Sequence, residues 1–236
     1  MSFIFLMLRV FILKNDILSF FLYNYYGGYM KKVIVLILSI LVITGFTFLS
    51  GFLSISNLEL KRLFFILINL LNGFVAFIAM KLTGIKIDFD FKNSKQFLIG
   101  FCIALILSLS IAFIPALCGV SLVGGHVDFS WNRFLFNLFF YMIIIGPVEE
   151  LIFRVYIQET CIGFFKNKWV GVVLASLLFG FYHFINGSFL QVLFTFGIGL
   201  IFGFCKFLIK DCKYLGISFG HGLYDFLNVI VTMFIV

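Results

Sequence analysis

The sequence predicts an all-α fold: a polytopic transmembrane helical bundle with seven core spans, plus an extra N-terminal helix if the first residues form one. Of the 236 residues, 63% are hydrophobic and only 11% are charged, and the mean hydropathy is +1.20. A soluble globular domain is about 45–50% apolar and about 25% charged, so this chain has too few charges to cover a soluble surface. Because about 20 apolar residues cross a bilayer, the length allows roughly seven or eight spans and no large extramembrane domain.

The first 29 residues differ from the rest of the chain. Charged residues between Arg9 and Asp16 interrupt their apolar runs, whereas a clean apolar run begins at Val33, directly after Met30-Lys31-Lys32. A methionine, two lysines and an apolar run are typical of the beginning of a membrane protein. We therefore expect residues 1–29 to be an extension that the native protein lacks, or a helix that lies in the membrane interface.

Seven apolar runs follow Lys32. They are Val33–Ile55, Leu63–Met80, Phe97–Leu117, a long run from Phe134 towards Phe165, Trp169–Ile185, Ser188–Ile209 and Leu215–Val236. If Lys31 and Lys32 are cytoplasmic, alternating spans leave outside only the basic residues Lys61, Arg62 and Arg133. The same alternation places inside the lysines Lys81, Lys86, Lys92, Lys95, Lys166, Lys168, Lys206, Lys210 and Lys213. This bias follows the positive-inside rule and supports the span count and the orientation.

The net charge of +7 has the same explanation. Most of the basic residues lie in loops between apolar runs, where lysines anchor a membrane protein beside anionic lipid headgroups. We therefore expect a multi-pass membrane protein whose partner is the lipid bilayer, and no nucleic-acid partner.

Three clusters of polar residues lie within the apolar runs. Insertion of each ionised group into the membrane costs roughly 2.5–3.5 kcal/mol, so such residues usually mark a functional site or a tight internal pair. The first cluster contains Pro147, Glu149, Glu150 and Arg154. Glu150 and Arg154 have the i,i+4 spacing of a helical ion pair, which leaves Glu149 without a partner on its own helix and available for proton transfer. Pro147 is expected to kink the helix and to open a wet cavity beside Glu149. The alternative is a purely structural network of all three charges.

The second and third clusters contain histidines. His183 ends an apolar run one turn after Phe179, and His221 shares a helix face with Asp225 and Asn228. Taken alone, the first is typical of a structural histidine and the second of a polar seam between helices. Taken together with Glu149, they form a hydrolytic set in which a carboxylate and a histidine activate water and a second donor stabilises an oxyanion.

Two points stay open at this stage. Glu149, His183 and His221 are also a familiar zinc ligand set with one open position, although the H-E-x-x-H pattern is absent. At the rise of an α-helix, Glu149 and His183 lie roughly 22–25 Å from the flanking Lys166 and Lys168, but His221 lies only roughly 12 Å from Lys213. Glu149, His183 and His221 lie at the same depth in the membrane only if the last helix starts above the membrane plane or is strongly tilted.

The ordered set Glu149-Glu150-x-x-x-Arg154, Phe179-x-x-x-His183 and His221-x-x-x-Asp225 resembles the CPBP family of intramembrane proteases. That family includes CAAX prenyl endopeptidases and bacterial bacteriocin-processing or self-immunity proteins. The resemblance covers about residues 130–236, which we take as the protease core, with residues 30–129 as N-terminal transmembrane helices.

The resemblance implies an endopeptidase that hydrolyses a peptide bond of a membrane-tethered peptide or protein. Glu149 and His221 would activate water, His183 and Asp225 would line the oxyanion site, and Arg154 would hold Glu150. Asp225 departs from the asparagine common in prenyl-processing members. Because ionised aspartate has no proton to donate, Asp225 is either protonated or orients His221 instead.

The family has been described both as metalloproteases and as metal-free glutamic proteases. Because the sequence offers no dedicated third strong ligand and Glu150 is expected to pair with Arg154, we favour the metal-free version and expect no cofactor. If the enzyme uses zinc, its ligands are Glu149, His183 and His221. The compact chain and lysine-rich loops resemble a bacterial member, which implies the bacterial plasma membrane and a small peptide precursor or a membrane-protein terminus as substrate. Two alternatives from other classes remain. One is a non-catalytic bacteriocin-immunity or scaffold protein of the same family, and the other is a proton-coupled transporter.

Overall fold

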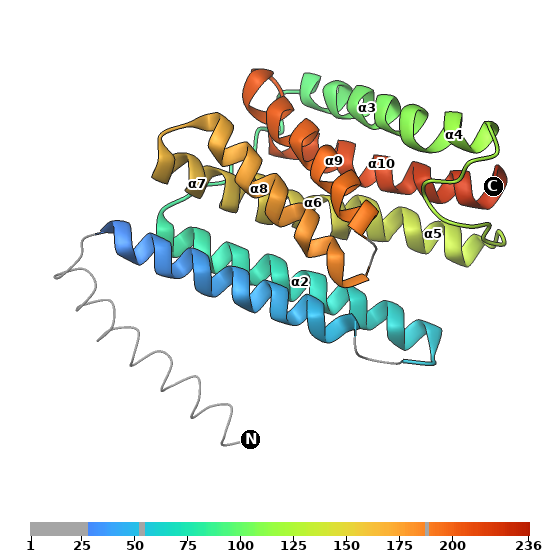
Figure 1. Ribbon diagram of the computed structural model, residues 1–236, viewed down its shortest axis with the longest axis horizontal. Helices are drawn as coiled ribbons and strands as arrows, with labels where there is room; N and C mark the ends of the chain where they lie inside the picture. Colours follow the sequence, from blue (N-terminus) through green and yellow to red (C-terminus); the bar gives the residue numbers. More distant parts are fainter. Residues whose placement is uncertain (1–27, 52–54, 187–188) are drawn as a thin grey trace.

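The computed structural model describes residues 28–51, 55–186 and 189–236, and these residues form helices joined by short connections, without a β-strand (Figure 1). The helices are Gly28–Gly51, α2 (Leu58–Thr83), α3 (Lys95–Ser108), α4 (Ile114–Leu117), α5 (Trp131–Phe139), α6 (Gly146–Glu150), α7 (Gln158–Phe165), α8 (Lys168–Tyr182), α9 (Phe189–Leu208) and α10 (Tyr214–Phe234). The all-α prediction is confirmed for this part of the chain. The predicted extension lies outside the described residues, apart from its last two, which begin the first helix.

Five of these helices are long and apolar enough to cross a membrane: Gly28–Gly51, Leu58–Thr83, Lys95–Leu117, Trp131–Phe165 and Phe189–Leu208. The seven-span prediction also counts α8, which has only 15 residues, and α10, whose 21 residues include polar His221, Asp225 and Asn228. The chain is therefore a multi-pass helical membrane protein. The count of seven and the division at residues 29 and 129 stay predictions.

The helix Trp131–Phe165 is the longest, with 35 residues, and α5, α6 and α7 are parts of it. Wider π-helical turns at Phe140–Ile145 and Leu151–Ile157 flank α6. Pro147 has no N–H to donate and its ring clashes with the carbonyl one turn earlier. The π-helical turn before it relieves that conflict, so Pro147 widens the helix without ending it, and Glu149 lies near the middle.

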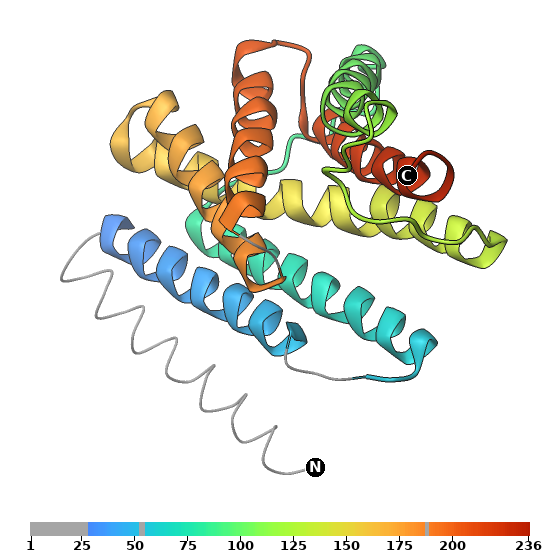
Figure 2. The same cartoon turned by 45° about the vertical axis from the view of Figure 1, so that its right-hand side comes forward.

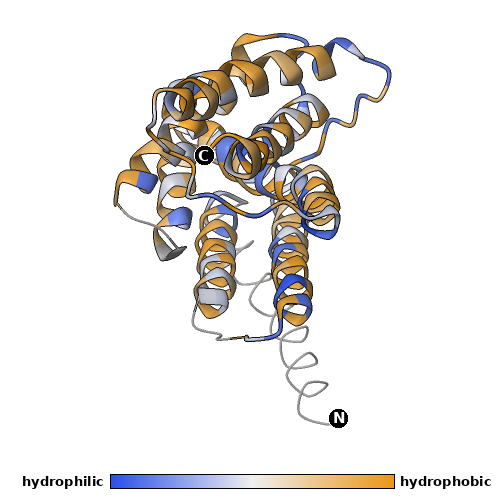
Figure 3. Ribbon diagram, turned by 90° about the vertical axis from the view of Figure 1, so that its right-hand side faces the viewer, coloured by the Kyte–Doolittle hydropathy of each residue, from blue (hydrophilic) through white to orange (hydrophobic). Residues whose placement is uncertain are grey.

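The helices form two groups around this long helix (Figures 1 and 2). Gly28–Gly51 and α2 run side by side along one flank, and α10 lies between α3 and the long helix on the other. The helices consist mostly of hydrophobic residues, whereas many hydrophilic residues lie in the connections (Figure 3). Many large hydrophobic side chains of the helices are exposed. This distribution suits a bundle surrounded by lipid.

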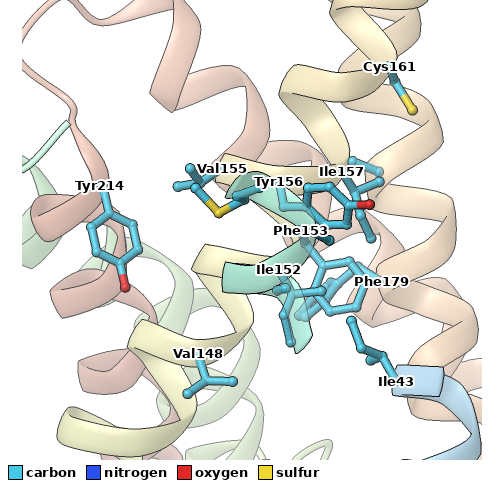
Figure 4. Packing of buried hydrophobic residues seen from close by; sticks show 14 of the residues in the cluster. Ile43, Val148, Ile152, Phe153, Val155, Tyr156, Ile157, Cys161, Phe179 and Tyr214 are labelled. Atoms are coloured by element: carbon cyan, nitrogen blue, oxygen red, sulfur yellow. The ribbon is translucent and has the colours of Figure 1, made fainter. Parts of the chain in front are cut away.

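A buried cluster joins the long helix to both flanks (Figure 4). Ile152, Phe153 and Tyr156 are almost inaccessible to solvent and pack with Phe179 of α8. The Tyr156 hydroxyl and Ser39 Oγ share a hydrogen bond of 2.8 Å, which ties the first helix to the long one. The long helix is thus held by side chains that lie one or two turns after Glu149.

Glycines allow the backbone of α10 to pack directly against the backbones of neighbouring helices. A Cβ atom added at Gly222 would lie 2.5 Å from the Tyr141 carbonyl oxygen, and one at Gly220 would lie 2.7 Å from the Gly100 carbonyl oxygen. A Cβ at Gly146 would overlap the Ser218 carbonyl. These contacts set the separation between α6, which carries Glu149, and α10, which carries His221.

The spacing of Gly199 and Gly203 likewise predicts close approach of another helix. That helix is α8: a Cβ at Gly203 would lie 2.8 Å from Val172 Cγ1, and one at Gly199 would lie 3.2 Å from Ser176 Cβ. The prediction of a packing role for both glycines is confirmed.

Replacement of Gly146 by alanine is expected to destabilise the protein by about 1–3 kcal/mol, the usual cost of overpacking a tight interior contact. It should also abolish activity of the site described below, because the added methyl group pushes α6 away from α10. Chemical unfolding in detergent measures the first effect. Gly163→Ala is the matched control, since a Cβ there meets no atom within 4 Å and alanine is favoured over glycine in a helix. Equal stability of the two variants would contradict the prediction.

Candidate active site

Three elements carry the predicted polar residues to one place. Glu149 and Glu150 lie on α6 in the middle of the long helix, and His221 and Asp225 lie one turn apart on α10. His183 follows the last residue of α8 and begins a short 3₁₀-helical turn, His183–Asn186. Since α6 packs against α10 through Gly146 and Gly222, and α8 lies against the long helix, these side chains converge.

Glu149 lies at the centre of the cluster. Its Oε2 atom is 3.6 Å from His221 Nε2 and 4.0 Å from His183 Nε2. His221 Nε2 is also 3.5 Å from Asp225 Oδ2. The structure therefore brings together all four residues that the sequence selects as catalytic candidates. These separations exceed a direct hydrogen bond, and a water molecule could bridge Glu149 and His221.

The second glutamate contacts two partners. Arg154 Nε lies 3.4 Å from Glu150 Oε2, the contact that the i,i+4 spacing predicts, and both side chains are fully buried. Glu150 Oε1 lies 2.8 Å from His221 Nδ1, a contact that the sequence does not reveal. An ionised carboxylate only accepts hydrogen bonds, so His221 donates from Nδ1 and its Nε2 is left facing Glu149. Glu150 thereby sets the tautomer and the orientation of the ring.

Aromatic rings surround this pair. The Phe202 ring stacks on His221 with centroids 5.2 Å apart, and the Phe179 ring meets His221 edge-on at 5.7 Å. The Arg154 guanidinium lies 4.8 Å from the centroid of Phe179. No described residue accepts a hydrogen bond from the three guanidinium nitrogens of Arg154. The interaction of Arg154 with Glu150 and Phe179 is thus mainly electrostatic, and Phe179 has the packing role expected for it.

His183 is also fixed by one ring nitrogen. Its Nδ1 lies 2.9 Å from the carbonyl oxygen of Phe179, and a carbonyl can only accept. His183 therefore donates from Nδ1, and in the neutral ring Nε2 carries a lone pair directed towards Glu149. A neutral His183 cannot donate a hydrogen bond from Nε2 to an oxyanion; the protonated ring can.

The cluster forms the inner wall of a cavity of about 780 Å³. The side chains of Glu150 and Arg154 are 0% exposed, those of His221 and Glu149 are 4% and 6% exposed, and those of Asp225 and His183 are 22% and 24% exposed. Exposure therefore rises in one direction, from the ion pair through Glu149 and His221 to the open space.

Several cavity residues lie outside the motifs. Tyr141 and Tyr182 line the cavity beside the cluster. Asn72 of α2 is fully buried and donates to Thr47 Oγ1 at 3.1 Å and to the Tyr182 hydroxyl at 3.4 Å. Polar residues at 47 and 72 interrupt apolar runs, which is the only signal in the sequence that could have drawn attention to them.

The depth disagreement for His221 has a structural cause. Lys206, near the end of α9, donates to the Arg154 carbonyl at 2.9 Å and pairs with Glu159. Arg154 lies 11 residues before the end of α7 at Phe165, or about 16 Å along the helix. The end of α9 therefore lies closer to the site than the α7–α8 connection does, so fewer residues of α10 are needed to reach it.

The zinc alternative requires three ligands grouped around one point. Among the residues that the structure describes, no group of three or more His, Cys, Asp or Glu side chains has an arrangement that could hold a metal ion. The choice between a metal-free site and a zinc site formed by Glu149, His183 and His221 stays a prediction.

Residues 131–227 match the family model described as type II CAAX prenyl endopeptidase Rce1-like. This segment is similar to the Rce1-like family. The match confirms the resemblance to the CPBP family, and the Rce1-like segment contains all four candidate catalytic residues together with Glu150 and Arg154. The family consists of membrane proteases of the CAAX type, so the chain is similar to membrane hydrolases. No curated protein and no solved structure matches the chain.

Proposed function

We propose that the chain is an intramembrane endopeptidase of the bacterial plasma membrane, with seven core spans, that hydrolyses a peptide bond of a membrane-associated peptide or protein. One observation carries the proposal: Glu149 Oε2 lies 3.6 Å from His221 Nε2 on the inner wall of a large cavity. Both groups face a site that the bundle shields from bulk water, where a general base is most effective.

Glu149 and His221 activate a water molecule that lies between them. One of them takes a proton while the water oxygen bonds to the carbonyl carbon of the substrate, and the carbonyl π bond becomes an oxyanion. When the C–N bond breaks, the same proton passes to the leaving nitrogen, so the products are a carboxylic acid and an amine. Glu150 accepts from Nδ1 of His221 throughout and stabilises the imidazolium whenever His221 holds the proton.

His183 and Asp225 have different tasks. Protonated His183 donates from Nε2 to the oxyanion, while its Nδ1 continues to donate to the Phe179 carbonyl. Asp225, 3.5 Å from His221 Nε2, orients that ring rather than donating to the oxyanion. The Tyr141 hydroxyl, which lines the same cavity as Asp225 and Glu149, is a further donor available to the oxyanion.

The cavity wall also restricts the substrate. It includes the acids Glu149 and Asp225, and none of the described residues that line it is Lys or Arg. A carboxylate of the substrate would find no Lys or Arg partner there and would lie near two acids, so we expect neutral or cationic peptide segments, such as part of a small peptide precursor or a membrane-protein terminus. Peptides with aspartate beside the scissile bond should be cleaved more slowly than those with alanine.

The proposal is tested with purified protein in detergent and a library of membrane-tethered fluorogenic peptides, with and without a strong metal chelator. We expect cleavage that the chelator does not change, because water is activated without a metal. Cleavage that the chelator abolishes and added zinc restores would support the zinc alternative with Glu149, His183 and His221 as ligands. If no peptide is cleaved and Glu149→Gln keeps the full phenotype in the native cell, the non-catalytic immunity or scaffold role takes its place.

A further inference from the structure

The two ends of the bundle differ in charge, and contacts between helices establish which connections share an end. The rings of Tyr29 and Phe164 lie 5.1 Å apart, so the beginning of the first helix adjoins the end of α7. Lys213 Nζ lies 2.6 Å from Asp88 Oδ2, and Asn93 donates to Asp211 at 3.1 Å, so the α2–α3 and α9–α10 connections are also neighbours. The helix ends joined by these contacts form the lysine-rich end.

The lysine-rich end carries Lys31, Lys32, Lys81, Lys86, Lys92, Lys95, Lys166, Lys168, Lys206, Lys210 and Lys213. The described acids at this end are Asp88, Asp90, Glu159 and Asp211, which are fewer than the lysines, so the net charge stays positive. The hydrogen bond and the negative charge of Asp88 raise the pKa of the Lys213 amine, with a smaller effect of Asp90, so Lys213 stays protonated. By the positive-inside rule, this end faces the cytoplasm.

The opposite end is made by the α4–α5 connection and its neighbours. The Val127 amide donates to the Thr232 carbonyl at 3.0 Å, which holds this connection against the end of α10. Arg62 Nη1 donates to Asn132 Oδ1 at 3.0 Å, which joins the beginnings of α2 and α5. Among the described residues this end contains the basic side chains Lys61, Arg62 and Arg133, and Glu59 pairs with Arg62 at 2.8 Å.

The cavity opens towards this second end. Its outer lining includes exposed Ser121, Leu122 and Gly124 of the α4–α5 connection, Leu190 at the beginning of α9, and Thr232 near the end of α10. On the closed side, Arg154 and Glu150 are fully buried, and Lys206 of the lysine-rich end contacts the Arg154 carbonyl. The rise in exposure from Glu150 to His183 therefore points away from the lysines.

We propose that substrates enter the cavity from the extracytoplasmic face of the membrane, through a mouth formed by the α4–α5 connection and the adjoining ends of α9 and α10. This inference rests on the proposed peptidase activity and specifies the class of substrate. The substrates are peptides that have been carried across the membrane or that are anchored in its outer leaflet.

The side of entry is tested by labelling in intact cells with a membrane-impermeant maleimide. The parent chain carries Cys102→Ser and Cys118→Ser, because these two native cysteines are exposed. Ser121→Cys places a thiol at the mouth, and Lys210→Cys is the matched probe at the lysine-rich end. We expect Ser121→Cys to react in intact cells above the background of the parent chain, and Lys210→Cys to react only after permeabilisation. The reverse pattern, or labelling of both before permeabilisation, would overturn the proposal.

A second measurement connects the mouth with catalysis. In right-side-out vesicles, a bulky maleimide at Ser121→Cys should block cleavage of a peptide added outside, relative to the same variant before labelling. The same reagent at Lys210→Cys, added after permeabilisation, should leave cleavage unchanged. Blocking only by the Lys210→Cys label would place entry on the cytoplasmic face. If the unlabelled protein cleaves no peptide, the proposed peptidase function fails, whereas the labelling pattern still decides the side of entry.

Discussion

Replacement of Glu149 by glutamine is expected to lower the rate of peptide cleavage about 10²–10⁴-fold, the usual contribution of a general base. Glutamine keeps the size of the side chain but cannot take a proton from water. Cleavage of the membrane-tethered peptides by wild type and variant at equal concentration measures the effect. The fold should be unaffected, because Oε2 of Glu149 forms no direct hydrogen bond. His221 Nε2, at 3.6 Å, is too far away to form one that glutamine would break.

Two further variants sharpen this test. Glu59→Gln is the matched control, since Glu59 is exposed at the beginning of α2 and pairs only with Arg62 among the contacts described for it. If Glu149 and His221 act as a unit on one water, the double variant Glu149→Gln/His221→Asn should be no slower than the slower single variant. Wild-type cleavage by Glu149→Gln would reject the proposed mechanism.

Replacement of Arg154 by methionine is expected to destabilise the protein by about 3–5 kcal/mol, because it leaves the fully buried Glu150 carboxylate without its counter-ion. The Glu150 and Arg154 side chains are both 0% exposed, so solvent cannot replace the missing charge. Chemical unfolding in detergent, monitored by tryptophan fluorescence, measures the loss.

The double variant Glu150→Gln/Arg154→Met separates charge from packing. It removes both charges, and the glutamine carbonyl can still accept the hydrogen bond from His221 Nδ1. We expect it to recover most of the stability, because a buried ion pair replaced as a whole is often neutral. If the double variant is as unstable as Arg154→Met, the Arg154 side chain stabilises the bundle by packing on Phe179 and not by balancing Glu150.

Much of this fold and site could be predicted because the relevant signals are local. A run of apolar residues such as Val33–Ile55 reports a membrane helix without knowledge of its neighbours, since burying apolar side chains in lipid requires no specific partner. Glu150 and Arg154 are one helical turn apart, so helix geometry alone predicts their contact. The ordered motifs at Glu149, His183 and His221 were sufficient for the family resemblance that the match over residues 131–227 confirms.

Contacts between residues that are far apart in the sequence could not be predicted in the same way. Glu150 and His221 are 71 residues apart, and nothing in either motif indicates that one orients the other. The π-helical turns on both sides of α6 arise from the balance between Pro147 and the packing around it, not from a residue pattern. Asn72 and Tyr182 meet only because α2 and α8 both pack against the long helix.

Hydropathy and short motifs were enough to identify a multi-pass helical membrane protein with an Rce1-like segment, because both depend on residues close together in the chain. The packing of the helices was needed to establish which nitrogen of His221 faces Glu149, how deep α10 begins and towards which end the cavity opens. Those properties depend on how closely helices approach, and the approach is set by backbone contacts at glycines such as Gly146 and Gly222. A glycine allows two helices to pack closely in several orientations, and the packing of the whole bundle determines which of them is adopted.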